Sequence, residues 1–138
     1  MKWVLGVIVS VLLGWLAVWY FRGLLHLGYL DSAIGTVRTL VAAEERYSQS
    51  HPGVGYTCML SELGRDQRIT TLAKTGEWNG YAFEVTGCPN SIGPNRTYRI
   101  AARPLVIGMP AICSDQSGIV KTDESGSIQR CLTSGAPI

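Results

Sequence analysis

Residue types that carry out catalysis are sparse in this chain. It has two histidines, His26 and His51. His26 follows the apolar N-terminal run, and His51 directly precedes Pro52, a position where a polar residue commonly ends a helix. The sequence has no nucleophile motif of the form G-x-S-x-G and no glycine-rich phosphate loop. We therefore predict no catalytic residue and no organic cofactor, and we expect a protein that is not an enzyme.

Two acidic tetrapeptides near the C-terminus are the candidates for metal chemistry. They are DQSG, beginning at Asp115, and DESG, beginning at Asp123. Carboxylates and nearby carbonyl groups are ligands for Ca²⁺, but this spacing matches no fixed calcium loop. Asp at the first position and Gly at the fourth are also typical of tight turns between strands. We expect turns and no metal, with Asp115 and Asp123 as the calcium candidates.

The four cysteines, Cys58, Cys88, Cys113 and Cys131, all follow the apolar run, and none forms a C-x-x-C pair typical of zinc sites. An even number in a small domain favours disulfides and an oxidising compartment. Of three possible pairings we favour Cys58 with Cys88 and Cys113 with Cys131. The outer strands of a flat three-stranded meander lie about 9.5 Å apart, too far for the second bond. We therefore expect residues 123–126 to open into a loop.

The N-terminal run contains no charged side chain over residues 3–21. A helix of this length is close to the roughly 30 Å hydrocarbon core of a bilayer. We interpret residues 1–29 as a single-pass transmembrane helix with its membrane-proximal segment. Disulfides would place residues 30–138 in an oxidising compartment, the periplasm or outside the cell, with the anchor in the cytoplasmic membrane. The anchoring aromatic residues are Trp3, Trp15, Trp19, Tyr20 and Phe21.

The next segment, residues 30–50, has apolar residues at helical spacing. Leu30, Ile34, Val37 and Val41 form the stripe, whereas charged residues such as Glu44 fall mostly off it. We predict that this helix continues the membrane span, buries the stripe against a sheet and ends at Pro52. Residues 51–80 are expected to be a connector, with a short helix at 61–64 and a possible turn at 69–74.

Alternating apolar and polar residues predict antiparallel strands at 81–86, 97–103 and 111–114. The fold class is therefore α+β, with one long N-terminal helix packed on a small antiparallel sheet that occupies residues 81–138. The expected contacts between helix and sheet are made by Ile34, Val37, Val41, Tyr81, Phe83, Val85, Tyr98 and Ile100. The net charge of +2 is spread along the chain, so we expect no nucleic acid partner.

This order of elements resembles the type IV pilin and type II secretion pseudopilin family. The sequence stretches that carry the resemblance are SAIGTVRTL at 32–40, EERY at 44–47, YTCMLSEL at 56–63, GYAF at 80–83 and CSDQSG at 113–118. The resemblance implies a membrane-anchored structural protein, a subunit or minor component of a pilus or pseudopilus. Its implied partners are membrane lipid and copies of itself or similar subunits, contacted through the N-terminal helix. Pseudopilins hold Ca²⁺ in a C-terminal loop, the region of Asp115 and Asp123.

The chain departs from that family at its N-terminus. Family members carry a basic leader, a Gly-Phe peptidase site and a Glu five residues into the mature helix. Here Met1 and Lys2 lead directly into the apolar run, no glycine in it precedes Phe, and the first acidic residue is Asp31. We therefore expect a plain signal anchor. The alternative function is a membrane-tethered extracytoplasmic binding or accessory module that does not polymerise.

Overall fold

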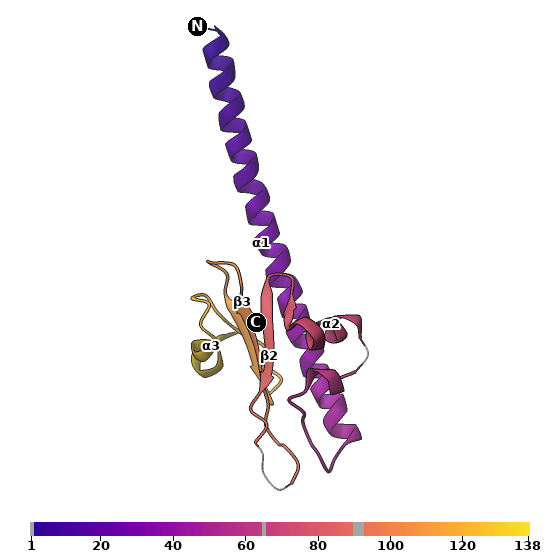
Figure 1. The fold of residues 1–138 in the computed structure, drawn as a ribbon. Coiled ribbons are helices and arrows are strands. Elements are labelled where there is room, and N and C mark those ends of the chain that lie inside the picture. Colours follow the sequence, from indigo (N-terminus) through magenta and orange to yellow (C-terminus); the bar gives the residue numbers. More distant parts are fainter. Residues whose placement is uncertain (1, 65, 90–92) are drawn as a thin grey trace.

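The computed structural model describes residues 2–64, 66–89 and 93–138. Its main feature is helix α1, Lys2–Ser50, which runs without a break for 49 residues. The first half projects alone, and the second half, residues 30–50, lies beside residues 51–138 (Figure 1). We call residues 30–138 together the head domain. The two predicted helical segments therefore form one helix, which ends before Pro52 as expected. Residues 90–92, between the first and second predicted strands, lie outside the described residues.

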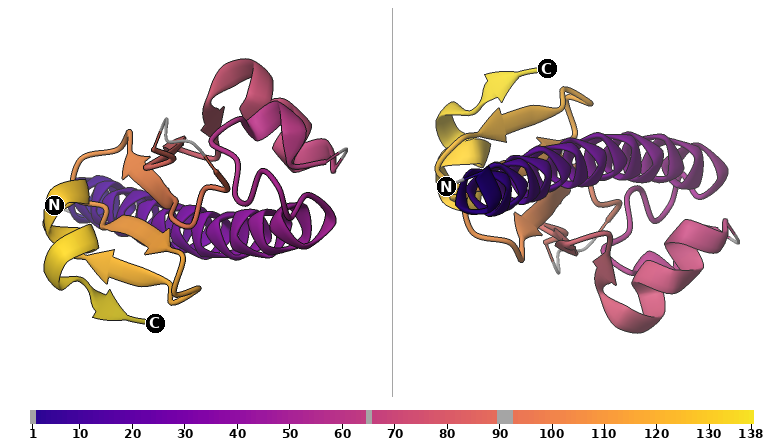
Figure 2. Two further views of the ribbon diagram at one scale, coloured as in Figure 1. Left: turned by 90° about the horizontal axis from the view of Figure 1, so that it is seen from below. Right: turned by 90° about the horizontal axis from the view of Figure 1, so that it is seen from above.

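Six strands form one antiparallel sheet with the order β1-β2-β3-β4-β5-β6, each strand beside its neighbour in sequence. Their bounds are β1 Glu77–Trp78, β2 Tyr81–Thr86, β3 Arg99–Pro104, β4 Ala111–Asp115, β5 Lys121–Asp123 and β6 Ala136–Pro137. Strands β2, β3 and β4 correspond to the three predicted strands. The sheet lies across α1 (Figure 2), which confirms the α+β class with a long helix packed on a small antiparallel sheet.

The helix and the sheet share one apolar core. Of the residues expected there, those fully or almost fully buried are Val37, Tyr81, Phe83, Val85, Tyr98 and Ile100. Ile34 and Val41 are only partly buried, because the centre of the buried helix face lies elsewhere. That centre runs through Ala33, Val37 and Leu40 to Glu44, at steps of four, three and four residues. The predicted stripe followed the larger side chains and missed the small Ala33.

The predicted connector contains more regular structure than expected. A 3₁₀ turn, η1, spans Leu60–Glu62, close to the predicted short helix, and helix α2 spans Gln67–Thr75 where only a turn was expected. The Asp66 side chain accepts hydrogen bonds from the first backbone N–H groups of α2, and Gly76 ends the helix at φ 71°. Asn79 and Gly80, both at positive φ, then form the turn between β1 and β2.

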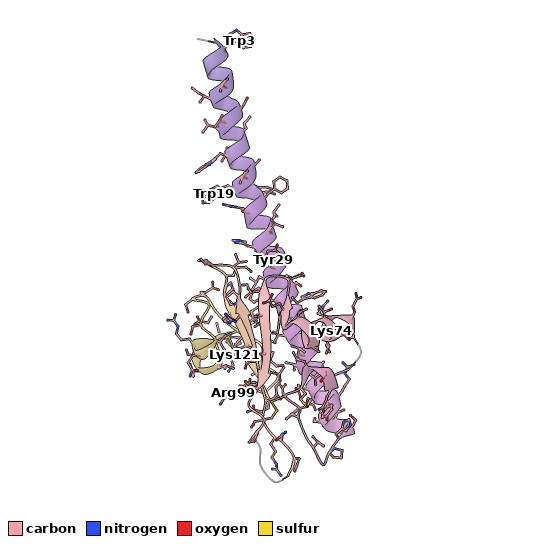
Figure 3. The ribbon with its side chains drawn as sticks, in the orientation of Figure 1. Trp3, Trp19, Tyr29, Lys74, Arg99 and Lys121 are labelled. Atoms are coloured by element: carbon pink, nitrogen blue, oxygen red, sulfur yellow. A yellow bond between two sulfur atoms is a disulfide. The ribbon has the colours of Figure 1, made fainter. Side chains whose placement is uncertain are left out.

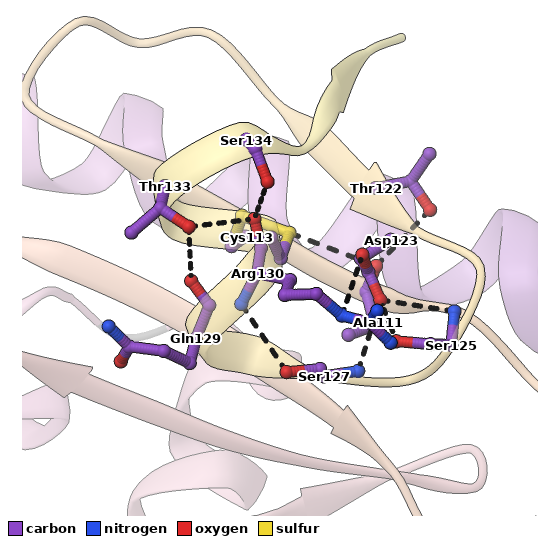
Figure 4. Close-up of polar contacts among 11 residues, drawn as sticks. Ala111, Cys113, Thr122, Asp123, Ser125, Ser127, Gln129, Arg130, Thr133 and Ser134 are labelled. Atoms are coloured by element: carbon purple, nitrogen blue, oxygen red, sulfur yellow. Dashed lines mark hydrogen bonds and ion pairs between the residues drawn. A yellow bond between two sulfur atoms is a disulfide. The ribbon is translucent and has the colours of Figure 1, made fainter.

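The C-terminal region returns across the sheet as a helix rather than as an open loop. Residues 123–126 form a tight turn, with Gly126 N–H bonded to Asp123 O at 3.0 Å, so the expected opening is wrong. Helix α3, Ile128–Ser134, follows with Ser127 as its N-cap (Figure 4). Cys113 and Ala111 of β4 face α3, whereas Ile112 belongs to the core with α1. Strand β4 is therefore covered by a helix on each side.

Both disulfides join the pairs that the sequence favoured. Cys58 and Cys88, with Cα atoms 5.9 Å apart, link the loop after α1 to the chain just beyond β2. Cys113 and Cys131, with Cα atoms 6.0 Å apart, link β4 to α3, and both are completely buried. Because α3 lies over the face of the sheet, Cys131 approaches Cys113 without crossing β5 within the sheet plane.

Removing the second disulfide tests whether it holds the C-terminal region. The double substitution Cys113→Ala with Cys131→Ala should lower the free energy of unfolding by about 3 kcal/mol, since the bond closes a short loop in the unfolded chain. Urea unfolding of the full chain in detergent micelles measures this loss. Hydrogen exchange should accelerate in residues 128–138. The matched control, Cys58→Ala with Cys88→Ala, should leave exchange in that region slow, and equal acceleration in both variants would contradict the assignment.

Candidate functional site

The N-terminal half of α1 is bare of any covering chain. Helix α1 is long and apolar enough to span a membrane, and its most apolar window is completely unburied. The large apolar residues exposed on it are Trp3, Val7, Ile8, Val9, Val11, Leu12, Leu13, Trp15, Leu16, Val18, Trp19, Tyr20, Phe21, Leu24, Leu25 and Leu27. A surface of this size is unstable in water, so lipid or other protein must cover it.

Of the predicted anchoring aromatics, Trp3 lies at one end of this bare surface and the others lie between its middle and the head. Trp3 is 89% exposed at one end, and Trp15, Trp19, Tyr20 and Phe21 gather toward the head. Figure 3 shows Trp3 and Trp19 projecting from the helix, with Tyr29 at the junction with the head. Sixteen helical residues separate Trp3 from Trp19, which corresponds to about 24 Å along the axis. This separation is shorter than the roughly 30 Å hydrocarbon core, so with Trp3 at one interface of a bilayer Trp19 lies short of the other.

Small residues make a flat strip on the same half of the helix. A Cβ atom added at Gly6 or at Gly14 would meet no other atom within 4 Å, and Ser10 lies between them in the four-residue rhythm. The Ser10 hydroxyl donates a hydrogen bond to the Gly6 carbonyl at 2.9 Å, so its polar group is already satisfied. Small residues at this spacing allow two helices to approach closely.

At the junction, the head domain is attached directly to the helix. Tyr29 packs beside Gly80 in the turn between β1 and β2, 3.5 Å from where a side chain at position 80 would begin. The Asn79 side-chain amide donates a hydrogen bond to the Ser32 hydroxyl at 2.9 Å. Ala33 is the first fully buried residue of α1. The chain therefore passes from bare helix to packed head within about two helical turns, with no flexible linker.

Glu44 is a completely buried carboxyl group, although its charge led us to place it outside the buried stripe. Its Oε2 accepts a hydrogen bond from the backbone N–H of Thr57 at 3.0 Å, and its Oε1 has no partner among the described residues. Glu62 Oε2 accepts hydrogen bonds from the Thr57 hydroxyl at 2.7 Å and the Tyr47 hydroxyl at 3.0 Å. These bonds hold the post-helix loop and η1 against the end of α1.

The same loop is also held from the other side. Gly55 pairs with Asn95 in a short parallel bridge, and a side chain at position 55 would collide with the Asn95 backbone. The Cys58–Cys88 disulfide adds a covalent link nearby in the chain. With the loop fixed on both sides, the Glu44 side chain stays covered and has no exposed surface. In the sequence, the burial of Glu44 is indicated by its position four residues after Leu40, on the same face of the helix.

Burial raises the pKa of Glu44 from 4.5 to about 7. The hydrogen bond from Thr57 opposes this rise, and the negative charge of Glu62 adds to it. The remaining titratable groups that face Glu44 are the phenols of Tyr47, Tyr56 and Tyr98, whose own pKa values are raised, first by burial. Glu44 forms no salt bridge among the described residues. The carboxyl group is therefore held largely neutral below pH 7.

The calcium candidates do not form a common site. Asp123 lies opposite Ala111 in the β4–β5 ladder, four residues from Asp115, so the backbone positions of the two aspartates are about 13 Å apart along the strand direction. Asp115 accepts a hydrogen bond from the Ser117 N–H, and Asp123 is bonded to Ser125, Ser127 and Arg130 (Figure 4). Both act as the predicted turn residues. In the described part of the chain no three His, Cys, Asp or Glu residues cluster as metal ligands would.

The histidines are far from each other. His26 lies exposed on the bare half of α1, and His51 follows the other end of the helix, about 37 Å away along its axis. The His51 ring stacks on Tyr47 at 4.2 Å, and its Nδ1 lies 3.1 Å from the Tyr47 carbonyl. His51 thus closes the helix end, which matches the structural interpretation made from sequence.

No protein-family model matches this sequence, and no curated protein matches it. The features of the chain that bear on its function are a bare apolar helix and a disulfide-bonded head domain that packing and hydrogen bonds hold to that helix.

Changing Glu44 to Gln tests the buried carboxyl group. Between about pH 4.5 and 7 the folded chain keeps a proton that the unfolded chain releases, so stability should fall as pH rises through this range. The loss is at most about 3 kcal/mol. Glu44→Gln should flatten this dependence in urea unfolding measured from pH 4 to 8. The exposed neighbour provides the control, Glu45→Gln, which should keep it. A slope that persists in Glu44→Gln would contradict the assignment.

Proposed function

We propose that this chain is a single-pass, membrane-anchored, pilin-like structural protein of bacteria, a subunit or minor component of a type IV pilus or secretion pseudopilus. The supporting observation is the continuity of α1 from a bare apolar half into a half buried under an antiparallel sheet. The bare half holds the protein in the cytoplasmic membrane, and the disulfide-bonded head lies in the periplasm or outside the cell. Its work is mechanical and requires no bound cofactor.

Two coverings suit the bare half at different stages. Lipid covers the uncharged residues 3–21 while the protein is in the bilayer. In an assembly, copies of the helix cover one another, and the strip of Gly6, Ser10 and Gly14 supplies a face for close approach. In both cases the rigid junction at Tyr29 keeps the head at a fixed distance from the helix contacts. This is the property required of a subunit whose heads form an outer layer.

One observation favours a second function, a membrane-tethered extracytoplasmic binding or accessory module that never polymerises. No acidic residue precedes Asp31, so the helix lacks the glutamate that the resembled family uses between neighbouring subunits. In this function the head works alone and the bare helix remains in lipid. The two functions share the anchor and differ in whether copies assemble.

The anchor itself is tested by a charge near the middle of the run. Leu12 is 57% exposed on the bare helix. An aspartate at the centre of a span costs about 3 kcal/mol in insertion, so Leu12→Asp should shift protein from the alkali-resistant membrane fraction to the soluble or degraded fraction. Leu12→Ala is the matched control and should remain in the membrane. Equal membrane retention of both variants would exclude a span at this segment.

Assembly is tested by following the head outside the membrane. We expect an antibody against the head to label sheared surface filaments in electron micrographs, and N-terminal sequencing of the filament protein to reveal the mature start. Label restricted to membranes, together with an unprocessed terminus, would exclude the filament subunit and support the tethered module. A strain that does not produce this protein controls for antibody specificity.

A further inference from the structure

The turn between β3 and β4, residues 105–110, presents an apolar tip beside the point where α1 leaves the head. Ile107 at this tip is 98% exposed and Leu105 is 45% exposed. No charged residue occurs from Pro104 to Ser114. A single exposed apolar side chain is ordinary on a protein surface. Ile107 differs from such a residue because it lies beside α1 on a turn whose base is fixed.

The base of the turn is fixed on several sides. The Leu105 N–H donates to the Gly80 carbonyl at 2.9 Å, and the Tyr81 hydroxyl donates to the Pro110 carbonyl at 3.0 Å. Met109 is buried in the core, with 4% of its surface exposed. The turn therefore cannot fold Ile107 back into the head, and the side chain is held outward.

The turn lies at the end of the head that faces the bare helix (Figure 1). Val106 and Tyr29 both lie within 4 Å of the position that a Cβ atom at Gly80 would take, so the turn is level with Tyr29 along α1. The bare apolar surface extends to Leu27, which is 64% exposed. Only about 3 Å of helix separates Leu27 from Tyr29. The apolar tip therefore continues the surface that the membrane would cover.

The dimensions of a bilayer agree with this position. From Trp3 to Tyr29 the helix rises by about 39 Å. The hydrocarbon core and one headgroup layer together span about 37 Å. An average helix tilt of about 20° reduces the height of Tyr29 above Trp3 from about 39 Å to about 37 Å. With Trp3 at the inner interface, the turn then meets the outer headgroup layer.

We propose that the β3–β4 turn is a second membrane contact, in which Ile107 and Leu105 enter the headgroup layer of the bilayer that holds α1. The proposal rests on the membrane anchor described above. Insertion is apolar rather than electrostatic, because charges of both signs lie on α1 and on the strand ends near the turn. They are Arg22, Asp31, Glu77, Arg103, Asp123 and Glu124. A zwitterionic lipid surface is therefore sufficient. The contact fixes which side of the head faces the membrane.

A fluorescent label at single introduced cysteines tests this contact, since all four native cysteines are paired in disulfides. The full chain is labelled with an environment-sensitive dye at Ile107→Cys and reconstituted in phosphatidylcholine vesicles that contain a lipid-borne nitroxide quencher. We expect a blue-shifted emission and roughly a twofold loss of intensity on adding the quencher lipid. The matched control is Ile119→Cys, in the exposed β4–β5 turn at the opposite end of β4, which should not be quenched.

A third label, at Leu13→Cys in the bare helix, separates the possible failures. Quenching at positions 13 and 107 but not 119 supports the second contact. Quenching at 13 alone overturns it while the anchor stands, and quenching at none of the three removes the anchor as well. Emission at 107 that shifts with protein density but ignores the quencher would assign this surface to a neighbouring copy, which also overturns the proposal.

Discussion

The rest of the molecule depends on the burial of one face of α1 against the sheet. Ala33, Val37 and Leu40 are completely removed from solvent there, and Ile100 and Ile112 belong to the same core. Because α1 contains no proline and continues unbroken, this packing also sets the direction of the bare half. The sheet would otherwise have an apolar face without a cover. The same contact thus folds the head and sets the direction of the bare half of α1.

Glu44 is the exception in this apolar interface, and its position explains it. A helix that buries Leu40 also turns the residue four positions later toward the core. The loop beyond α1 closes over this position because it is joined to Asn95 and to Cys88. The carboxyl group keeps one hydrogen bond, from Thr57, and loses water. Neutralisation is less costly than burying the charge, so the rise in its pKa follows from the fold.

The parts of the fold predicted from sequence are those with a long or regular pattern. The alternation of Tyr81, Phe83 and Val85 identified β2, and the uncharged run identified the bare half of α1. The favoured cysteine pairs were also found, although the predicted opening of residues 123–126 was wrong. Periodicity fails for Glu44, because a charged side chain is normally counted as exposed and its burial depends on the loop that covers it.

Short elements escaped prediction because they depend on contacts made elsewhere. Helix α2 buries only Ile69 and Leu72, too few for a clear period, and helix α3 buries a single residue, Cys131, so the disulfide and the adjacent strand determine its position.

The absence of a linker between the two halves of α1 has a mechanical consequence. Tyr29 and Ser32 contact the β1–β2 turn, so a tilt of the bare half moves the whole head with it. The head is stiff in turn, because β4 is held between α1 and α3 and a disulfide joins it to α3. A force on the distal loops is therefore transmitted through the head to the bare half of α1. Rotation of α1 about its axis would likewise decide which edge of the head meets a neighbouring molecule.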